Sequence, residues 1–304
     1  MKILHAGIAG ILLLTGCAGG RISVMKTADA VTAEAAKPDY DIAALSALAS
    51  GFKAGYISDK KLLQYSDAEL ARLFSALSDV TFYLPEQDTY VELQERVFRN
   101  KSVRNTCDKA DIRSMYKAYL GARMFAKADA LRKEFPDTKF YSMPEKVVSD
   151  LPPGRNSWRV YNVLDEGKTV ELRDSHLGSG SKVAMLMLPG CEVAEAAMQK
   201  ILAAPDLAPA FRRHGMVMTN RVNAESVALW KSHFNFPEVF LAYKASDFPG
   251  FDFHSSPTFY FLVDGKVRYS FSGWSRRENP DYGRNELLKG FAAISVSTSP
   301  AAAQ

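Results

Sequence analysis

Apolar residues recur at helical spacing between residues 41 and 147. A capping box at Ser66–Glu69 begins one amphipathic helix, since a serine and a glutamate three residues apart satisfy each other's backbone amides. Pro85 is placed to begin a second helix and Asp108 to cap a third. A fourth helix spans residues 123–135 and ends at a proline. The pattern predicts an all-α domain of helical hairpins over 41–147.

Residues 148–157 separate this helical region from a region of different period. They contain two prolines and a glycine, which interrupt regular structure. Beyond them, short apolar or alternating runs predict strands, and helical runs separate some of these strands. The predicted strands are 158–164, 169–172, 182–188, 216–218, 258–263 and 267–271, and the predicted helices are 192–203, 223–233 and 284–294. The order predicts an α/β domain over 158–294, with a mixed sheet and flanking helices on both faces.

The first sixteen residues have the anatomy of an export signal. Lys2 supplies a positive charge, and the apolar run that ends at Leu14 is shorter than the ~20 residues of a transmembrane helix. The sequence Leu14-Thr15-Gly16-Cys17 resembles the lipobox of bacterial lipoproteins, whose signal is cleaved before a cysteine that is then diacylated. The resemblance implies lipidation of Cys17. An ordinary signal peptide, cleaved after Ala18 or Gly19, is the alternative.

The same resemblance implies a location. Lipoproteins retained at the inner membrane usually carry aspartate after the lipidated cysteine, whereas this chain has Ala18. We therefore expect a lipid-anchored protein of the cell envelope, at the outer membrane and facing the periplasm. Residues 17–40 are rich in Ala, Gly, Thr and Lys without a steady period, so we expect a flexible tether there and a disordered tail over 295–304.

Composition and charge exclude several classes of protein. The 304 residues are 47% hydrophobic and 24% charged, as in globular proteins and unlike disordered or polytopic membrane chains. The net charge of +4, from 38 basic and 34 acidic residues, is spread along the chain, so nucleic acid is not an expected partner. No Cys/His cluster has zinc spacing, and neither a metal nor a cofactor is expected.

Two junctions in the α/β region are suited to thiol chemistry. Cys191 stands where the strand 182–188 passes into a helix, and the positive end of the helix dipole favours a thiolate there. Pro257 opens the strand 258–263, where a proline cannot pair as other residues do. A cis Ser256–Pro257 bond would resolve this and would leave backbone groups of Ser256 open to an extended peptide.

Together these junctions resemble a thioredoxin fold over residues 158–294. The resemblance is carried by Lys182–Cys191 and by the run from Ser256 to Val267. In that family the first active-site cysteine ends the central strand and a cis-proline loop lies against it. The resemblance therefore implies a nucleophile at Cys191 and a peptide-docking loop at Ser256 and Pro257.

Three positions depart from the family's pattern. Its second cysteine is Ala194 here, the tryptophan before its first cysteine is Gly190, and its buried carboxylate is Met185. Release of a mixed disulfide needs a second thiol. With Cys17 used as the anchor, Cys107 is the remaining candidate for a resolving partner, although a buried, unreactive cysteine is the alternative for it.

The sequence thus predicts thiol–disulfide chemistry on envelope proteins, which would be the clients, with the membrane contacted through lipidated Cys17. Two alternatives stay open: Cys191 as an unreactive core residue, and a non-enzymatic binding or scaffold lipoprotein on a degenerate thioredoxin fold. His254 could assist deprotonation of Cys191, or could be a structural or solvated loop histidine. In the helical region, the stretch from Tyr119 to Pro136 resembles a degenerate tetratricopeptide pair, with a small helical bundle as the alternative.

Overall fold

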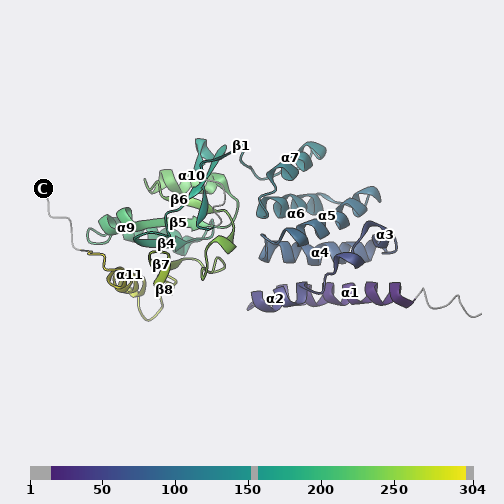
Figure 1. Cartoon of the computed structure of the whole chain (residues 1–304), viewed down its shortest axis with the longest axis horizontal. Helices are drawn as coiled ribbons and strands as arrows, with labels where there is room; N and C mark the ends of the chain where they lie inside the picture. Colours follow the sequence, from purple (N-terminus) through teal and green to yellow (C-terminus); the bar gives the residue numbers. More distant parts are fainter. Residues whose placement is uncertain (1–14, 152–156, 299–304) are drawn as a thin grey trace, which may run out of the picture. The chain divides into compact units, whose positions relative to one another are not determined.

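The computed structural model describes residues 15–151 and 157–298, with side chains from Gly19 onward (Figure 1). The chain divides between Phe140 and Tyr141 into two compact units. Residues 1–14 of the predicted export signal, 152–156 of the predicted boundary and 299–304 of the predicted tail lie outside the described residues. Within the described part of the chain, no helix combines the length and the hydropathy that a membrane crossing requires.

The N-terminal unit is all α. Its helices are α1 Thr15–Ala35, α2 Ile42–Ala49, α3 Asp59–Leu62, α4 Asp67–Tyr83, α5 Asp88–Val103, α6 Lys109–Gly121 and α7 Phe125–Glu134, with a short 3-10 helix η1 Ala54–Tyr56. Capping boxes begin α4 and α6, at Ser66 with Glu69 and at Asp108 with Asp111. Successive helices from α4 to α7 pack as neighbours, which confirms the predicted helical region. The second of these helices begins at Asp88 instead of at Pro85.

The predicted flexible tether is wrong over most of its length, because residues 15–35 form the helix α1. Val24, Ala28 and Val31 are spaced four and three residues apart and are fully buried or nearly so. The helix α1 packs against α4 and α2. Burial of this narrow stripe of small side chains stabilises a segment whose own sequence period is weak.

An eight-stranded mixed sheet forms the core of the C-terminal unit. Its strands are β1 Lys146–Ser149, β2 Arg159–Leu164, β3 Thr169–Asp174, β4 Ser181–Leu186, β5 Gly215–Thr219, β6 Val239–Ala242, β7 Thr258–Val263 and β8 Lys266–Ser272. The helices are α8 Glu192–Ala203, α9 Ala208–His214, α10 Ala224–His233 and α11 Tyr282–Ala293, with 3-10 helices η2 Asp165–Gly167 and η3 Ala245–Asp247. These elements confirm the predicted α/β class with a mixed sheet and flanking helices.

The strand order places β4 and β7 side by side, with only β8 beyond β7 on that side of the sheet. The order is β1-β3-β2-β6-β5-β4-β7-β8, with β4 parallel to β5 and antiparallel to β7. Leu186, the last residue of β4, pairs with Thr258, the first of β7. The end of β4 and the start of β7 therefore meet at one edge of the sheet, and both connections that the sequence singled out lie there.

Three details of this unit differ from the sequence prediction. β1, which the prediction placed at the end of the helical region, pairs in parallel with β3. β6 was not predicted, because the run Val239–Ala242 is only four residues long. The helix α9 was not predicted, because Ala208–His214 spans only seven residues.

Candidate functional site

The connection from β4 to α8 is a tight turn held by backbone hydrogen bonds. The Met187 amide donates to the Met218 carbonyl at 2.8 Å, which continues the pairing with β5, and the Cys191 amide donates to the Leu188 carbonyl at 3.1 Å. Gly190 has φ +81°, a conformation that glycine adopts without steric cost, and an added Cβ would meet open space. The turn therefore delivers Cys191 directly to the start of α8.

Cys191 is the N-cap residue of α8. Its carbonyl accepts hydrogen bonds from the amides of Ala194 and Glu195, at 3.0 and 3.1 Å. Its side chain does not cap the helix, so the first amides of α8 remain directed at the space beside the sulfur. The thiol is half-buried, and its Sγ–H donates to the carbonyl oxygen of Ser256 at 3.6 Å.

The loop that carries Ser256 is joined to the same turn by a second hydrogen bond. The Leu188 amide donates to the hydroxyl oxygen of Ser256 at 2.9 Å. The Ser256–Pro257 peptide bond is cis, as the sequence predicts. Within the described chain the Ser256 amide has no hydrogen-bond partner. The Ser256 carbonyl, by contrast, accepts the hydrogen bond of the Cys191 thiol. Of the two backbone groups predicted to be available to a peptide, only the amide is therefore without a partner in the described chain.

The loop before Pro257 is fixed by polar contacts among its own residues. The Asp252 amide donates to the Tyr260 hydroxyl at 2.7 Å, and the Ser255 hydroxyl donates to the Asp252 carboxylate at 2.8 Å. The Thr258 hydroxyl donates to the Ser255 carbonyl at 3.2 Å. These bonds fix the backbone on both sides of Ser256.

An ion pair that the sequence analysis missed fixes the far end of this loop. Arg159 on β2 donates to both carboxylate oxygens of Asp247 in η3, at 2.6 and 2.9 Å, and Asp247 is 3% exposed. The hydrogen bond with Asp247 raises the pKa of Arg159 above its usual value. Since 88 residues separate the two side chains, no local pattern in the sequence reports this contact.

Aromatic side chains hold the same loop on the sheet. Phe248 and Phe253 belong to the buried cluster on one sheet face, and Phe251 stacks on Tyr260 with ring centroids 4.1 Å apart. The loop between β6 and β7 is therefore anchored by a charge pair at one end and by packing along its length.

The charges beside the thiol are mixed. Glu192 and Glu195 lie in the first turn of α8, where their carboxylates offset part of the positive dipole. Burial lowers the pKa of His254 below its usual value. In the described residues the His254 ring makes no hydrogen bond to Cys191, and its amide is held by Asp252.

Cys107, the predicted resolving partner, lies in the N-terminal unit between α5 and α6. Its thiol donates to the Phe98 carbonyl at 3.5 Å. Burial, with Asp111 nearby, raises the pKa of the Cys107 thiol to about 11. Cys107 and Cys191 are both free thiols, and they belong to different units.

A metal site does not accompany these thiols. Within the described residues, no group of three His, Cys, Asp or Glu side chains could hold a metal ion. Met185 and Met187 are buried in the core.

Strand order and site geometry together define the architecture of the C-terminal unit. A central strand ends at a cysteine that caps a helix, and a cis-proline loop leading into the antiparallel neighbour lies against that cysteine. The unit is thioredoxin-like. Ala194, fully buried in the first turn of α8, occupies the position where a thioredoxin-like dithiol site would have its second cysteine.

Comparison with known proteins adds one structural match. No family model and no curated protein matches the chain. Among solved structures, a thioredoxin-like protein from Bacteroides caccae ATCC 43185 aligns with 10% identity and a TM-score of 0.28, over 95% of this chain and 99% of that chain. At this level of similarity, the thioredoxin-like description rests on the strand order and the site.

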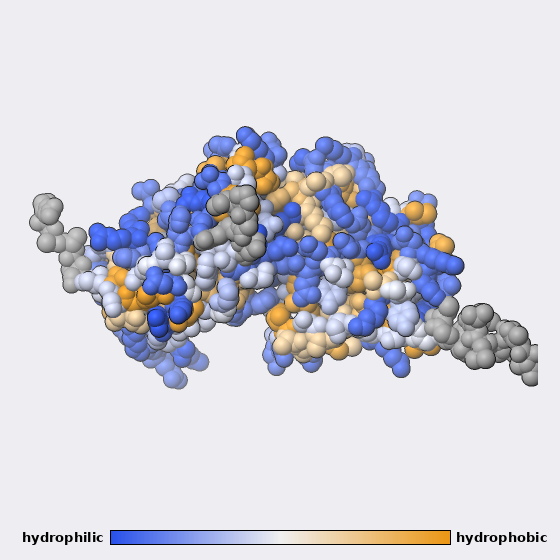
Figure 2. Space-filling model, viewed as in Figure 1, coloured by the Kyte–Doolittle hydropathy of each residue, from blue (hydrophilic) through white to orange (hydrophobic). Residues whose placement is uncertain are grey.

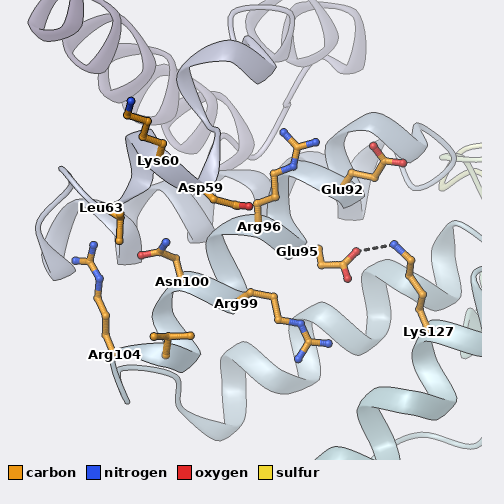
Figure 3. A pocket seen from close by; sticks show the side chains of 11 residues that line it. Asp59, Lys60, Leu63, Glu92, Glu95, Arg96, Arg99, Asn100, Arg104 and Lys127 are labelled. Atoms are coloured by element: carbon orange, nitrogen blue, oxygen red, sulfur yellow. Dashed lines mark hydrogen bonds and ion pairs between the residues drawn. The ribbon is translucent and has the colours of Figure 1, made fainter.

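A groove on the N-terminal unit was not anticipated from the sequence. It has a volume of about 670 Å³ and is lined by α3, α5 and α7 (Figure 3). Much of its charge is internally paired: Lys127 binds Glu95 at 2.6 Å, and Arg99 binds Glu134 at 2.7 Å. Because its residues are far apart in the sequence, the spacing of charges within single helices gave no signal for it.

Proposed function

We propose that this chain is a lipid-anchored envelope protein whose thioredoxin-like unit performs thiol–disulfide exchange on other envelope proteins through Cys191. The observation that carries the proposal is the placement of Cys191 at the N-cap of α8, with its sulfur 3.6 Å from the Ser256 carbonyl. A thiol at a helix N-terminus is stabilised as the thiolate, which is the nucleophile in exchange.

The first step is attack of the Cys191 thiolate on one sulfur of a client disulfide. A bond forms between Cys191 and that sulfur, the client's S–S bond breaks, and the other client sulfur leaves as a thiolate that takes a proton from water. The product is a mixed disulfide. Because Ala194 offers no thiol, a second thiol must resolve it.

Resolution requires a thiolate that attacks the Cys191 sulfur and releases the client with both thiols reduced. A small-molecule monothiol would supply that group and leave Cys191 in a mixed disulfide with it, to be reduced by a second such molecule. Cys107 would instead leave a Cys107–Cys191 disulfide, which needs Cα atoms within about 7 Å. The raised pKa of Cys107 favours the small-molecule route, since few of its thiols are ionised near neutral pH.

Client docking would use the open backbone of the loop and the apolar surface next to the thiol. The Ser256 amide can donate to a carbonyl of an extended peptide, in the way that one strand adds to another. Val193, 45% exposed and two residues beyond Cys191, offers apolar contact to the same peptide. Ser256 contacts the attacking thiol of Cys191, and Val193 belongs to the helical turn that Cys191 begins.

A binding or scaffold role is the second candidate. It is supported by Ala194 in place of a resolving cysteine, and by the hydrogen bond that the Cys191 thiol makes to the Ser256 carbonyl. In that case the same loop would hold a partner without covalent chemistry.

Trapping of mixed disulfides in the cell distinguishes the two. Cells are treated with acid and alkylated, and proteins joined to the chain are separated under non-reducing conditions. We expect adducts with the wild-type chain and with Cys107→Ser, and none with Cys191→Ser. Adducts that persist in Cys191→Ser would refute the nucleophile assignment. The mass of the N-terminal peptide tests acylation of Cys17 separately.

A further inference from the structure

The end of the N-terminal unit nearest Cys17 carries exposed apolar side chains. Ile22 on α1 is 56% exposed, Tyr56 in η1 is 41% exposed, and Leu63 just after α3 is 71% exposed. Figure 2 shows such apolar patches among a mostly hydrophilic surface. Single exposed apolar residues are ordinary, so the significance of these three depends on what lies around them.

Two contacts join the segment 53–64 to the first turns of α1. A Cβ added at Gly20 would lie 2.4 Å from the ring of Tyr56, so this ring packs directly on the α1 backbone. The Arg21 guanidinium donates to the Gln64 carbonyl at 2.8 Å, which joins the residue after Leu63 to the same turn. Figure 1 shows α3 at the same end of the N-terminal unit as the start of α1. We call this surface, formed by residues 19–26 and 53–64, the α1 end.

The α1 end is basic. Its two segments contain five basic residues and one acidic residue. The basic residues are Arg21, Lys26, Lys53, Lys60 and Lys61, and the acidic residue is Asp59. Glu69, just outside the two segments, pairs with Arg21 at 2.9 Å and offsets one of these charges. An excess of positive charge remains beside the exposed apolar side chains.

The short distance along α1 between Cys17 and the α1 end would keep this surface close to an acyl group on Cys17. Cys17 is within α1, and the helix rises about 1.5 Å per residue, so Ile22 lies about 7.5 Å along the axis from Cys17. An acyl group on Cys17 would thus be joined to the folded unit without an intervening tether. The lipid headgroups and the α1 end would be within a few residues' reach of each other.

We propose that the α1 end lies on an anionic phospholipid surface and acts as a second membrane contact beside the acyl anchor. The orientation rests on the proposed function, through lipidation of Cys17. Apolar and tyrosine side chains insert at the headgroup boundary, and lysines nearby are attracted to anionic lipid. A lipid chain with such a second contact binds membranes more stably than a chain alone.

The test uses the mature chain, residues 17–304, with Cys17→Ser so that no acyl group contributes. Binding is measured by co-sedimentation with vesicles of phosphatidylcholine alone, or with about one-third phosphatidylglycerol. We expect binding to the anionic vesicles and little to the neutral ones. The double variant Lys53→Gln with Lys60→Gln should weaken binding to the anionic vesicles more than tenfold, because each lysine contributes about fivefold to the affinity. Ile22→Ser with Leu63→Ser should weaken it severalfold.

Matched variants lie elsewhere on the chain. Lys133→Gln with Lys139→Gln removes the same charge from the α7 side of the unit, and Leu229→Ser removes a side chain that is 64% exposed on α10. Both should bind as the unsubstituted chain does. No binding to anionic vesicles, or an equal loss in the matched variants, would overturn the proposal. Because the probe chain carries no lipid, this result is independent of whether Cys17 is acylated in the cell.

Discussion

The sulfur of Cys191 lies 3.6 Å from the carbonyl oxygen of Ser256, and the hydroxyl of the same serine accepts the Leu188 amide. One residue therefore binds both ends of the turn that delivers the thiol to α8. The contact joins positions 65 residues apart in the chain. It makes the geometry of the thiol depend on the β6–β7 loop as much as on its own helix.

Ser256→Ala should destabilise the C-terminal unit, because the Leu188 amide loses its acceptor. A hydrogen bond of this kind contributes about 1 kcal/mol to the free energy of unfolding. Chemical denaturation measures this loss. Ser232→Ala, which removes a surface hydroxyl bonded within α10, is the matched control and should cost less. Equal losses in the free energy of unfolding for the two variants would contradict a stabilising role for the hydrogen bond between Leu188 and Ser256.

Ala194→Cys should create a dithiol site. Position 194 is three residues after Cys191 in the first turn of α8, and a cysteine there can resolve a mixed disulfide. We expect turnover of a disulfide-containing peptide to rise by at least about tenfold, with a disulfide between Cys191 and the introduced cysteine in the oxidised protein. Ala194→Ser is the control for size and polarity. The proposed role of Cys191 fails if the cysteine variant turns over the peptide no faster than the serine variant.

Asp247→Asn should loosen the loop that carries Ser256. The substitution leaves the Arg159 guanidinium, whose side chain is 19% exposed, without its charged partner. Breaking a largely buried pair costs about 2 to 3 kcal/mol in the free energy of unfolding. The exposed pair of Arg99 with Glu134 supplies the control, since Glu134→Gln should cost much less. Comparable losses in both variants would contradict the anchoring role of Asp247.

Gly290→Ala should destabilise the packing of α11 against β7. An added Cβ would lie 2.2 Å from the ring of Phe261, which is fully buried and also packs against Phe291. Overpacking costs about 1 to 3 kcal/mol, of which the better helix propensity of alanine returns up to about 1 kcal/mol. Gly55→Ala in η1 meets open space and serves as the control. Thermal unfolding compares the two, and an unchanged Gly290→Ala protein would refute this packing.

The sequence predicted those parts of the fold whose signal is local. The helix caps at Ser66 and Asp108 and the apolar run of β4 each depend on neighbours a few residues away. The position of Cys191 at a strand-to-helix junction follows from the same kind of signal.

What the sequence did not predict depends on contacts between distant segments. The helix α1 is stabilised by packing on α4 instead of by a marked period, and the four residues of β6 are a strand because β2 and β5 lie on either side. At the site, neither the Ser256 hydrogen bonds nor the Asp247 ion pair has a local pattern. The lipid anchor at Cys17 and the resolving role of Cys107 stay predictions.

Alkylation of the native protein tests the central assignment most directly. At neutral pH, mass spectrometry of the protein treated with a thiol alkylating agent should show modification of Cys191 well before Cys107, whose thiol has a pKa raised to about 11 by burial. The rate at Cys107 should rise only in alkaline solution, as its thiolate forms, whereas unfolding should make the two rates similar. A native Cys191 that reacts no faster than Cys107 would contradict the proposal that Cys191 is a nucleophile.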